Sequence, residues 1–143
     1  LPSLPRAELM SKNDELVTRY FPGFKLNPEG SLPYYEGDYT TASSRHFKFR
    51  LVLPPGSPDT KPLLYIWAPT RLPKWGGGTV NSLGCSHAFH TLENGPGGRV
   101  QICHAGMWHA GITYVAVLAR AIWWAEAYCQ HIKKGKNISA YFS

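Results

Sequence analysis

The side chains best suited to covalent chemistry in this sequence are three thiols, at Cys85, Cys103 and Cys129. A thiolate attacks a carbonyl carbon readily and leaves it readily, so one cysteine can carry an acyl group from a donor to an acceptor. Cys129 falls on the apolar stripe of a predicted helix and is expected in the core. Cys85 is expected to have a structural or incidental role. The alternation of apolar and polar residues around Cys103 predicts only that this side chain packs in the core or at an edge. Whether it also does chemistry has to be argued from the residues near it.

Histidines and glycines surround Cys103 in the sequence. His104 is adjacent, although neighbouring residues on a strand point to opposite faces, and His90 or His109 can fold back across the site. A cation beside a cysteine favours the reactive thiolate. The tetrahedral intermediate of acyl transfer also needs hydrogen-bond donors aimed at its oxyanion. The glycine-rich stretch before Cys103 would let backbone N–H groups approach that position.

Two other chemistries use the same residue types. A zinc site takes four ligands, but the spacing C-x-H-x-x-H followed by C-H matches no common zinc pattern. The residues concerned are Cys85, His87, His90, Cys103, His104 and His109. A cysteine peptidase would use Cys85 or Cys103 with a downstream histidine, but the local signatures of the papain and caspase families are absent. Both readings are therefore disfavoured.

The pattern along the chain predicts a single α+β domain over residues 1–143. Apolar residues at helical spacing predict a first helix over residues 3–21 and a long last helix over residues 112–134, which Gly135 ends. Alternating or apolar runs predict strands over residues 34–41, 45–53, 61–68 and 99–103. Short turns join the first three strands, as in an antiparallel meander. Residues 69–98 are predicted to form a long loop, of a length that is uncommon in a compact domain unless the loop serves function or is disordered.

Spacing also predicts which faces of these elements are buried. Phe47, Phe49 and Leu51 alternate with polar residues, so the strand over residues 45–53 is expected to turn them towards the core. Trp123 and Trp124 are expected in the core or at an interface. The predicted core stripe of the last helix consists of Ile112, Val115, Ala119, Ile122, Ala125 (or Glu126), Cys129 and Ile132.

Three segments carry a resemblance to a known family. FKFRLVLPPGSPDTKPLLYIWAP resembles the second and third strands of the ubiquitin-conjugating (UBC) fold, with the proline-rich turn between them. HTLENGPGGRVQICH, followed by Trp108, is similar to the active-site region of that family, where a cysteine ends a short extended segment. WWAEAYCQHIKKGK looks like the closing helix of prokaryotic members. Within the family, the chain most resembles the stand-alone bacterial conjugating enzymes of CBASS anti-phage operons.

The resemblance implies an α+β UBC-like fold: an N-terminal helix, a four-stranded antiparallel meander, a glycine-rich active-site loop and a long C-terminal helix. It implies a thioester-forming acyl transferase in which Cys103 is catalytic, with His90, Asn94 and His104 as candidate supporting residues. His90 would orient or hydrogen-bond rather than act as a base. Eukaryotic members carry His-Pro-Asn, whose Asn supports the oxyanion, whereas this chain has His90-Thr91-Leu92. Oxyanion support would then come from backbone N–H groups or Asn94.

The resemblance also implies partners. The conjugated object would be the C-terminus of a cyclic-nucleotide synthase (CD-NTase), or alternatively a bacterial ubiquitin-like protein. The chain has no room for an adenylating domain, so a separate activating enzyme is expected. No cofactor or metal is implied. A non-enzymatic binding module with the same fold is the remaining alternative, and Cys103 in the expected place argues against it, because inactive members lack the cysteine.

The net charge of +6 invites a nucleic-acid reading, but the cations are spread along the chain. The one tight run is Lys133, Lys134 and Lys136 at a predicted helix end, where cations complement the helix dipole. This run is expected to be a solvated surface, or else a docking site for an acidic protein surface. No transmembrane helix, secretory signal or disulfide framework is indicated, so we expect a cytoplasmic protein that binds neither nucleic acid nor membrane.

Overall fold

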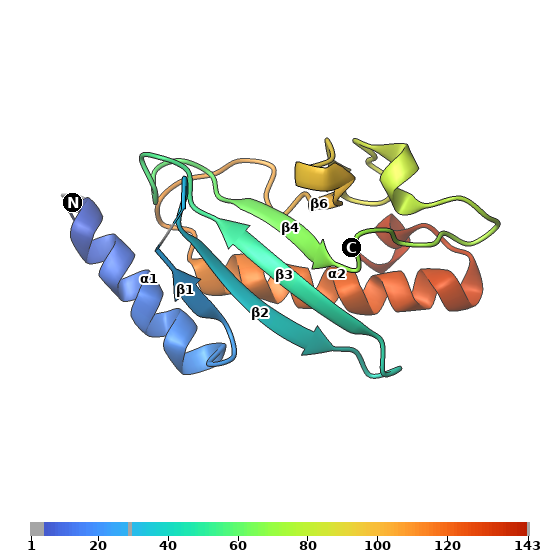
Figure 1. Ribbon diagram of the computed structural model, residues 1–143, viewed down its shortest axis with the longest axis horizontal. Coiled ribbons are helices and arrows are strands. Elements are labelled where there is room, and N and C mark those ends of the chain that lie inside the picture. Colours follow the sequence, from blue (N-terminus) through green and yellow to red (C-terminus); the bar gives the residue numbers. More distant parts are fainter. Residues whose placement is uncertain (1–4, 29, 143) are drawn as a thin grey trace.

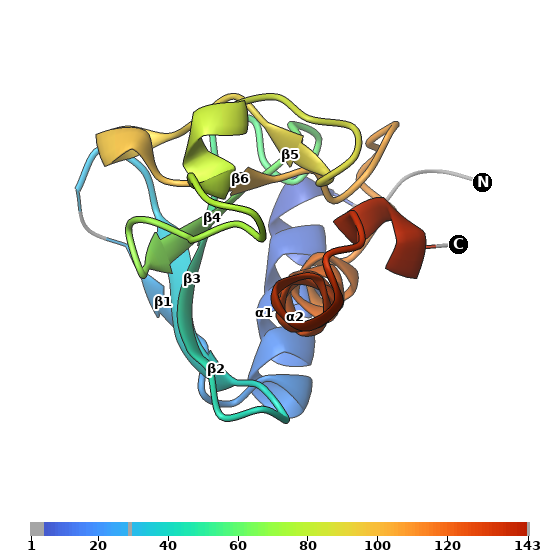
Figure 2. The same cartoon turned by 90° about the vertical axis from the view of Figure 1, so that its right-hand side faces the viewer.

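The computed structural model describes residues 5–28 and 30–142 of the chain. A curved antiparallel sheet wraps around one long helix, α2 (Tyr114–Lys134), and the first helix, α1 (Arg6–Tyr20), packs beside α2 (Figures 1 and 2). The predicted α+β class, with a helix before the strands and a long helix after them, is confirmed. The predicted start of the first helix at residue 3 lies outside the described residues.

Within the described residues the sheet has six strands in the order β1-β2-β3-β4-β6-β5, and all neighbours are antiparallel. The strands are β1 (Lys25–Asn27), β2 (Tyr34–Thr40), β3 (His46–Val52), β4 (Leu63–Ala68), β5 (Thr91–Leu92) and β6 (Gln101–Ile102). The predicted count of four strands is therefore wrong. The unpredicted strands, β1 and β5, have three and two residues, too few for a two-residue alternation to be visible in the sequence.

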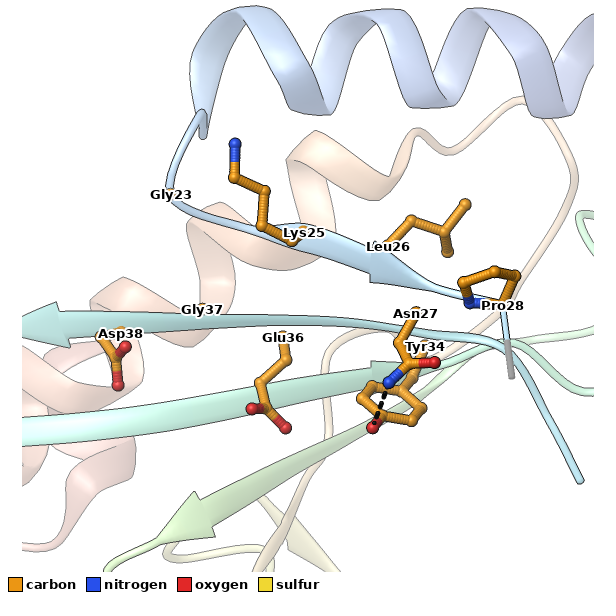
Figure 3. A pocket seen from close by; sticks show the side chains of 9 residues that line it. All are labelled: Gly23, Lys25, Leu26, Asn27, Pro28, Tyr34, Glu36, Gly37 and Asp38. Carbon is orange, nitrogen blue, oxygen red and sulfur yellow. Dashed lines mark hydrogen bonds between the residues drawn. The ribbon is translucent and has the colours of Figure 1, made fainter. Parts of the chain in front are cut away.

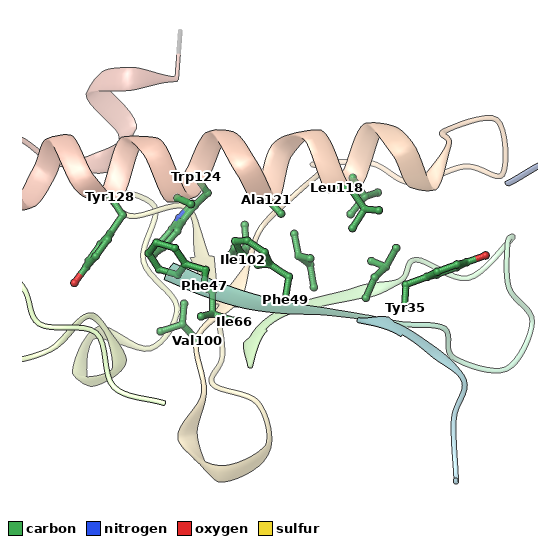
Figure 4. Close-up of a cluster of buried hydrophobic side chains, with 14 of the residues drawn as sticks. Tyr35, Phe47, Phe49, Ile66, Val100, Ile102, Leu118, Ala121, Trp124 and Tyr128 are labelled. Carbon is green, nitrogen blue, oxygen red and sulfur yellow. The ribbon is translucent and has the colours of Figure 1, made fainter. Parts of the chain in front are cut away.

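The core lies between the concave face of the sheet and α2 (Figure 4). The prediction for β3 is confirmed, because Phe47, Phe49 and Leu51 are fully buried. The predicted stripe of α2 is largely wrong. The residues that α2 buries are instead Tyr114, Val117, Leu118, Ala121, Trp124, Ala125, Ala127, Tyr128, Cys129 and His131. Large aromatic side chains take the centre of the interface, and most of the predicted residues lie at its margin.

The ends of α2 follow from local chemistry. The side chain of Thr113 accepts a hydrogen bond from the backbone N–H of Ala116 at 3.2 Å, which caps the first turn. Gly135 ends the helix in the left-handed region at φ 80°, as the sequence predicts. Neither of the α-helices that the structure describes combines the length and apolar character that crossing a bilayer requires.

The segment between β4 and β6 is organised by one buried amide. The Oδ1 atom of Asn81 accepts the backbone N–H of Leu72 at 2.9 Å. Its Nδ2 group donates to the carbonyls of Thr70 and Gly98, both at 2.8 Å. Two short 3-10 turns, Val80–Leu83 and Pro96–Gly98, flank β5. Asn81 therefore ties the start of the segment to the turn that leads into β6, although the sequence predicts only a loop there.

Candidate active site

Cys103 immediately follows β6 and points away from the core. The side chains on either side of it are buried: Ile102 is 1% exposed and His104 is 6% exposed. Cys103 is itself partly exposed and its thiol is free. Because successive side chains of an extended segment point to opposite faces, this pattern places the Cys103 side chain on the outer face. The thiol is therefore neither sealed in the core nor consumed by a disulfide.

The backbone of Cys103 is fixed opposite His90. Thr91 and Leu92 of β5 pair with Ile102 and Gln101 of β6, and the next rung is the N–H of Cys103 donating to the carbonyl of His90 at 2.9 Å. His90 has φ 52°, a left-handed conformation that non-glycine residues rarely adopt. Such conformations persist only where their surroundings over-determine them. The structure thus brings His90 and Cys103 together, as the sequence predicts.

The turn that ends in His90 is held from below by α2 and the C-terminal segment. The indole N–H of Trp124 donates to the carbonyl of Phe89 at 2.8 Å. The N–H of Ser139, in the 3-10 turn Ile138–Tyr141, donates to the carbonyl of Ala88 at 2.8 Å. These two bonds hold the turn, and through it the rung to Cys103, in a defined position.

The imidazole of His90 is neutral near pH 7. Its pKa is lowered from 6.5, first by burial and then by repulsion from His87 and Arg120. The expectation that His90 supplies a cation beside the thiol is therefore not supported. Its ring lies 4.7 Å from the ring of Phe142, which the sequence did not identify as a site residue.

His104 lies behind the site rather than in it. Its Nε2–H donates to the carbonyl of Pro62 at 2.7 Å, and its ring packs edge-on against Trp108 at 5.7 Å. Burial lowers the pKa of His104, so this ring is also neutral. Its buried Nδ1 atom has no hydrogen-bond partner among the described residues. His104 therefore anchors the chain after Cys103. Its position behind the site is expected, because neighbouring side chains of an extended segment point to opposite faces.

Two further hydrogen bonds, one from Lys61 and one from Trp108, complete this anchor. Lys61 donates through Nζ to the carbonyl of Ala105 at 2.7 Å. The indole N–H of Trp108 donates to the carbonyl of Pro58 at 2.8 Å. The turn between β3 and β4 thereby holds the segment after Cys103, and Trp108 has the packing role expected of it.

Arg120 is a candidate site residue that sequence reasoning missed. Its charge acts on His90, across the ladder from Cys103, and on His104, next to Cys103 in the chain. Its guanidinium lies 5.0 Å from the centre of the Phe142 ring. The signal was present, because Arg120 is a lone cation that interrupts the apolar stretch of the last helix.

Asn94 is not brought to Cys103. It lies beyond the other end of β5, where its Nδ2 group donates to the carbonyl of Asn81 at 2.8 Å. The neighbouring Gly95 pairs with Arg99, four residues before Cys103. At about 3.3 Å per residue, that register separates the two positions by roughly 13 Å. The structure therefore does not bring Asn94 and Cys103 together.

The cysteines and histidines considered for a metal do not converge. Within residues 5–28 and 30–142, no group of three or more His, Cys, Asp or Glu side chains is placed to hold one ion. Cys85 is exposed, and His109 accepts the N–H of Gly111 through Nδ1 at 3.1 Å in the loop before α2. Cys129 is buried and contacts the hydroxyl of Thr41, which confirms its core position. The metal-site alternative gains no support.

A hollow of about 550 Å³ lies between β1 and β2, at the edge of the sheet opposite β5 (Figure 3). Its described lining includes no cysteine or histidine. Glu36 there pairs with Arg50 and Lys48, and Asp38 pairs with His46. Tyr34 accepts a hydrogen bond from the Asn27 amide at 2.8 Å. This hollow therefore offers no group for acyl transfer.

Comparison of the chain with models of protein families, with curated proteins and with solved structures found no match. What the site can do therefore has to be argued from its own geometry. It offers one partly exposed, free thiol at the end of a strand, a neutral imidazole across the ladder and a cation on α2. That set suits a nucleophile that accepts and releases an acyl group.

Proposed function

We propose that the chain is a conjugating enzyme with the UBC fold, and that Cys103 carries its acyl intermediate. The observation that carries this proposal is the free thiol of Cys103, held at an outward position by the rung to His90. The order of first helix, strand meander, glycine-rich segment, cysteine and long helix supports the fold assignment. The matching segments in the sequence support the family.

The reaction requires an activated carboxyl end on a partner protein. The sulfur of Cys103 attacks that carbonyl carbon, the thiol proton is lost to solvent, and the group that activated the carboxylate leaves. An acceptor amine then attacks the thioester, an amide forms, and the thiol of Cys103 is regenerated. The activated donor comes from a separate activating enzyme, which uses ATP.

The chain's own residues contribute position and charge. The ladder bond to His90 and the anchors at His104 and Trp108 fix the backbone on both sides of the nucleophile. Fixed geometry lowers the entropic part of the barrier. The Arg120 guanidinium favours the oxyanion of the tetrahedral intermediate, in place of the asparagine that eukaryotic members use.

The donor is a protein C-terminus, that of a cyclic-nucleotide synthase in an anti-phage operon. Genes next to the one for this chain supply the candidates. A synthase gene found next to it would support the anti-phage role. A ubiquitin-like gene with separate activating and deconjugating enzymes would replace the synthase by that protein as the donor.

The test is reconstitution with the neighbouring donor, an activating enzyme and ATP. We expect an adduct that reductant cleaves for the wild-type chain, an adduct that resists reductant for Cys103→Ser, and none for Cys103→Ala. Cys85→Ser is the matched control, because Cys85 is also free and exposed but lies outside the ladder, and it should behave as wild type. Equal conjugation by a folded Cys103→Ala chain rejects the proposal.

A further inference from the structure

The loop after β4 reaches the C-terminal end of α2 (Figure 1). An exposed tryptophan and four lysines lie on or beside these two segments. We call this surface the lysine–tryptophan patch: Lys74, Trp75, Lys133, Lys134 and Lys136. The Trp75 side chain is 54% exposed. Its backbone N–H donates to Nε2 of His131 at 3.1 Å, which joins the loop to the helix. Two segments far apart in the sequence therefore form one surface.

The patch carries positive charge that the chain does not balance. None of its four lysines forms an ion pair with a residue that the structure describes, and the ion pairs that do form engage cations elsewhere. The C-terminal end of a helix offers only about half an elementary negative charge. The helix dipole thus accounts for a small part of four positive charges. The rest remains available to an acidic partner.

The patch is also rigid. His131 uses both ring nitrogens, because Nε2 accepts the Trp75 N–H and Nδ1 donates to the carbonyl of Lys136 at 2.7 Å. The hydroxyl of Tyr128 donates to the carbonyl of Pro73 at 2.6 Å. Gly135 lets the indole approach so closely that a Cβ there would lie 2.9 Å from it. A large aromatic side chain held in place loses little freedom on binding, which suits an interface anchor.

The patch connects directly to the candidate nucleophile. The His131 ring packs edge-on against Phe89, with centroids 4.8 Å apart. Phe89 precedes His90, whose carbonyl holds the N–H of Cys103. The patch is therefore linked to the thiol through His131, Phe89 and the turn that ends in His90. A protein fits better than a nucleic acid, because the patch is compact, contains no arginine, and is linked through packed side chains to a cysteine suited to a protein carboxyl end.

We propose that the lysine–tryptophan patch docks an acidic segment of the protein whose C-terminus is attached to Cys103. This inference rests on the proposed function. The electrostatic contacts bring the donor to the surface, and Trp75 provides the apolar contact that fixes it there. The carboxyl end then extends along the turn that ends in His90 to reach Cys103.

The binding test uses the Cys103→Ala chain, so that no thioester can form, and fluorescence anisotropy of a labelled oligoglutamate peptide. The double variant Lys133→Glu/Lys134→Glu should weaken binding by about tenfold or more, and Trp75→Ala should weaken it as well. The matched control is Lys12→Glu/Lys25→Glu, which makes the same change in net charge, from +6 to +2, on unpaired exposed lysines of α1 and β1. The control should stay within about threefold of the parent chain.

Three results would overturn the docking proposal: no binding of the peptide, equal weakening by the control, or tighter patch-dependent binding of an oligothymidylate of the same charge. The last result would identify a nucleic-acid surface. In the conjugation reaction, free oligoglutamate should compete with the donor for the wild-type chain and far less for the patch variant. Absence of any thioester would reject the proposed function and leave the anisotropy result to decide docking by itself.

Discussion

Replacing Asn81 by alanine tests how the glycine-rich segment before Cys103 is held in place. The Asn81 side chain is 7% exposed and makes three hydrogen bonds, to backbone groups of Thr70, Leu72 and Gly98. Each such bond contributes a net of about 0.5–1.5 kcal/mol, and removal of one partner leaves the other buried without compensation. We therefore expect Asn81→Ala to lower the free energy of unfolding by about 3 kcal/mol.

The assay is urea unfolding followed by tryptophan fluorescence and circular dichroism. With a slope of roughly 1.5–2 kcal/mol per molar urea, the midpoint should fall by about 1.5–2 M. Asn94→Ala is the control, because it removes one part-buried hydrogen bond to the carbonyl of Asn81, and it should cost at most about 1 kcal/mol. Asn81→Asp should be as destabilising as Asn81→Ala. It keeps the oxygen that accepts the Leu72 N–H, but it replaces the donating Nδ2 group by an oxygen that faces the carbonyls of Thr70 and Gly98. An Asn81→Ala chain within about 0.5 kcal/mol of wild type would refute this reasoning.

Three further predictions follow from the site and the helix ends. Arg120→Gln should slow thioester formation by about tenfold or more in single-turnover assays, because the oxyanion loses a cation, and an unchanged rate would remove Arg120 from the site. Burial lowers the pKa of His104 from 6.5, so the unfolded chain binds a proton that the folded chain does not, and stability should fall as the pH drops below about 6.5. His104→Gln should flatten part of that dependence in urea titrations, with the remainder due to His90. Gly135→Ala should cost about 1–2 kcal/mol from its left-handed φ, and should also change the fluorescence of Trp75; an unaltered midpoint would contradict it.

The parts of the fold that could be predicted are those with a repeated local signal. β3 has seven residues in strict alternation, so its buried face is evident from Phe47 and Phe49. The end of α2 is visible in Gly135. The buried face of α2 was not predictable in the same way, because apolar residues surround much of that helix. Ile122 and Ile132, on the predicted stripe, are only partly buried, whereas Tyr114 and Tyr128 are fully buried.

In the candidate site, too, only the features with a local sequence signal could be predicted. Cys103 at the end of an extended segment follows from local pattern, and so does His104 on the opposite face. The partnership of Cys103 with His90 depends on the register of a two-residue strand, and the influence of Arg120 depends on how α2 crosses beneath it. The separation of Asn94 from Cys103 was not visible in the sequence, because it depends on an antiparallel register that carries residues beyond Leu92 away from Cys103. Such relations arise from tertiary packing and leave little trace in spacing.

The most direct test of the acyl-carrier role is to locate the adduct on the wild-type chain. The chain is charged with its activated donor, the intact mass is measured without reductant, and the adduct is assigned by peptide mapping at acidic pH. The account predicts one donor per chain, on the peptide that contains Cys103, and its release by free thiol. An adduct on Cys85 or on a lysine, with Cys103 unmodified, would contradict it.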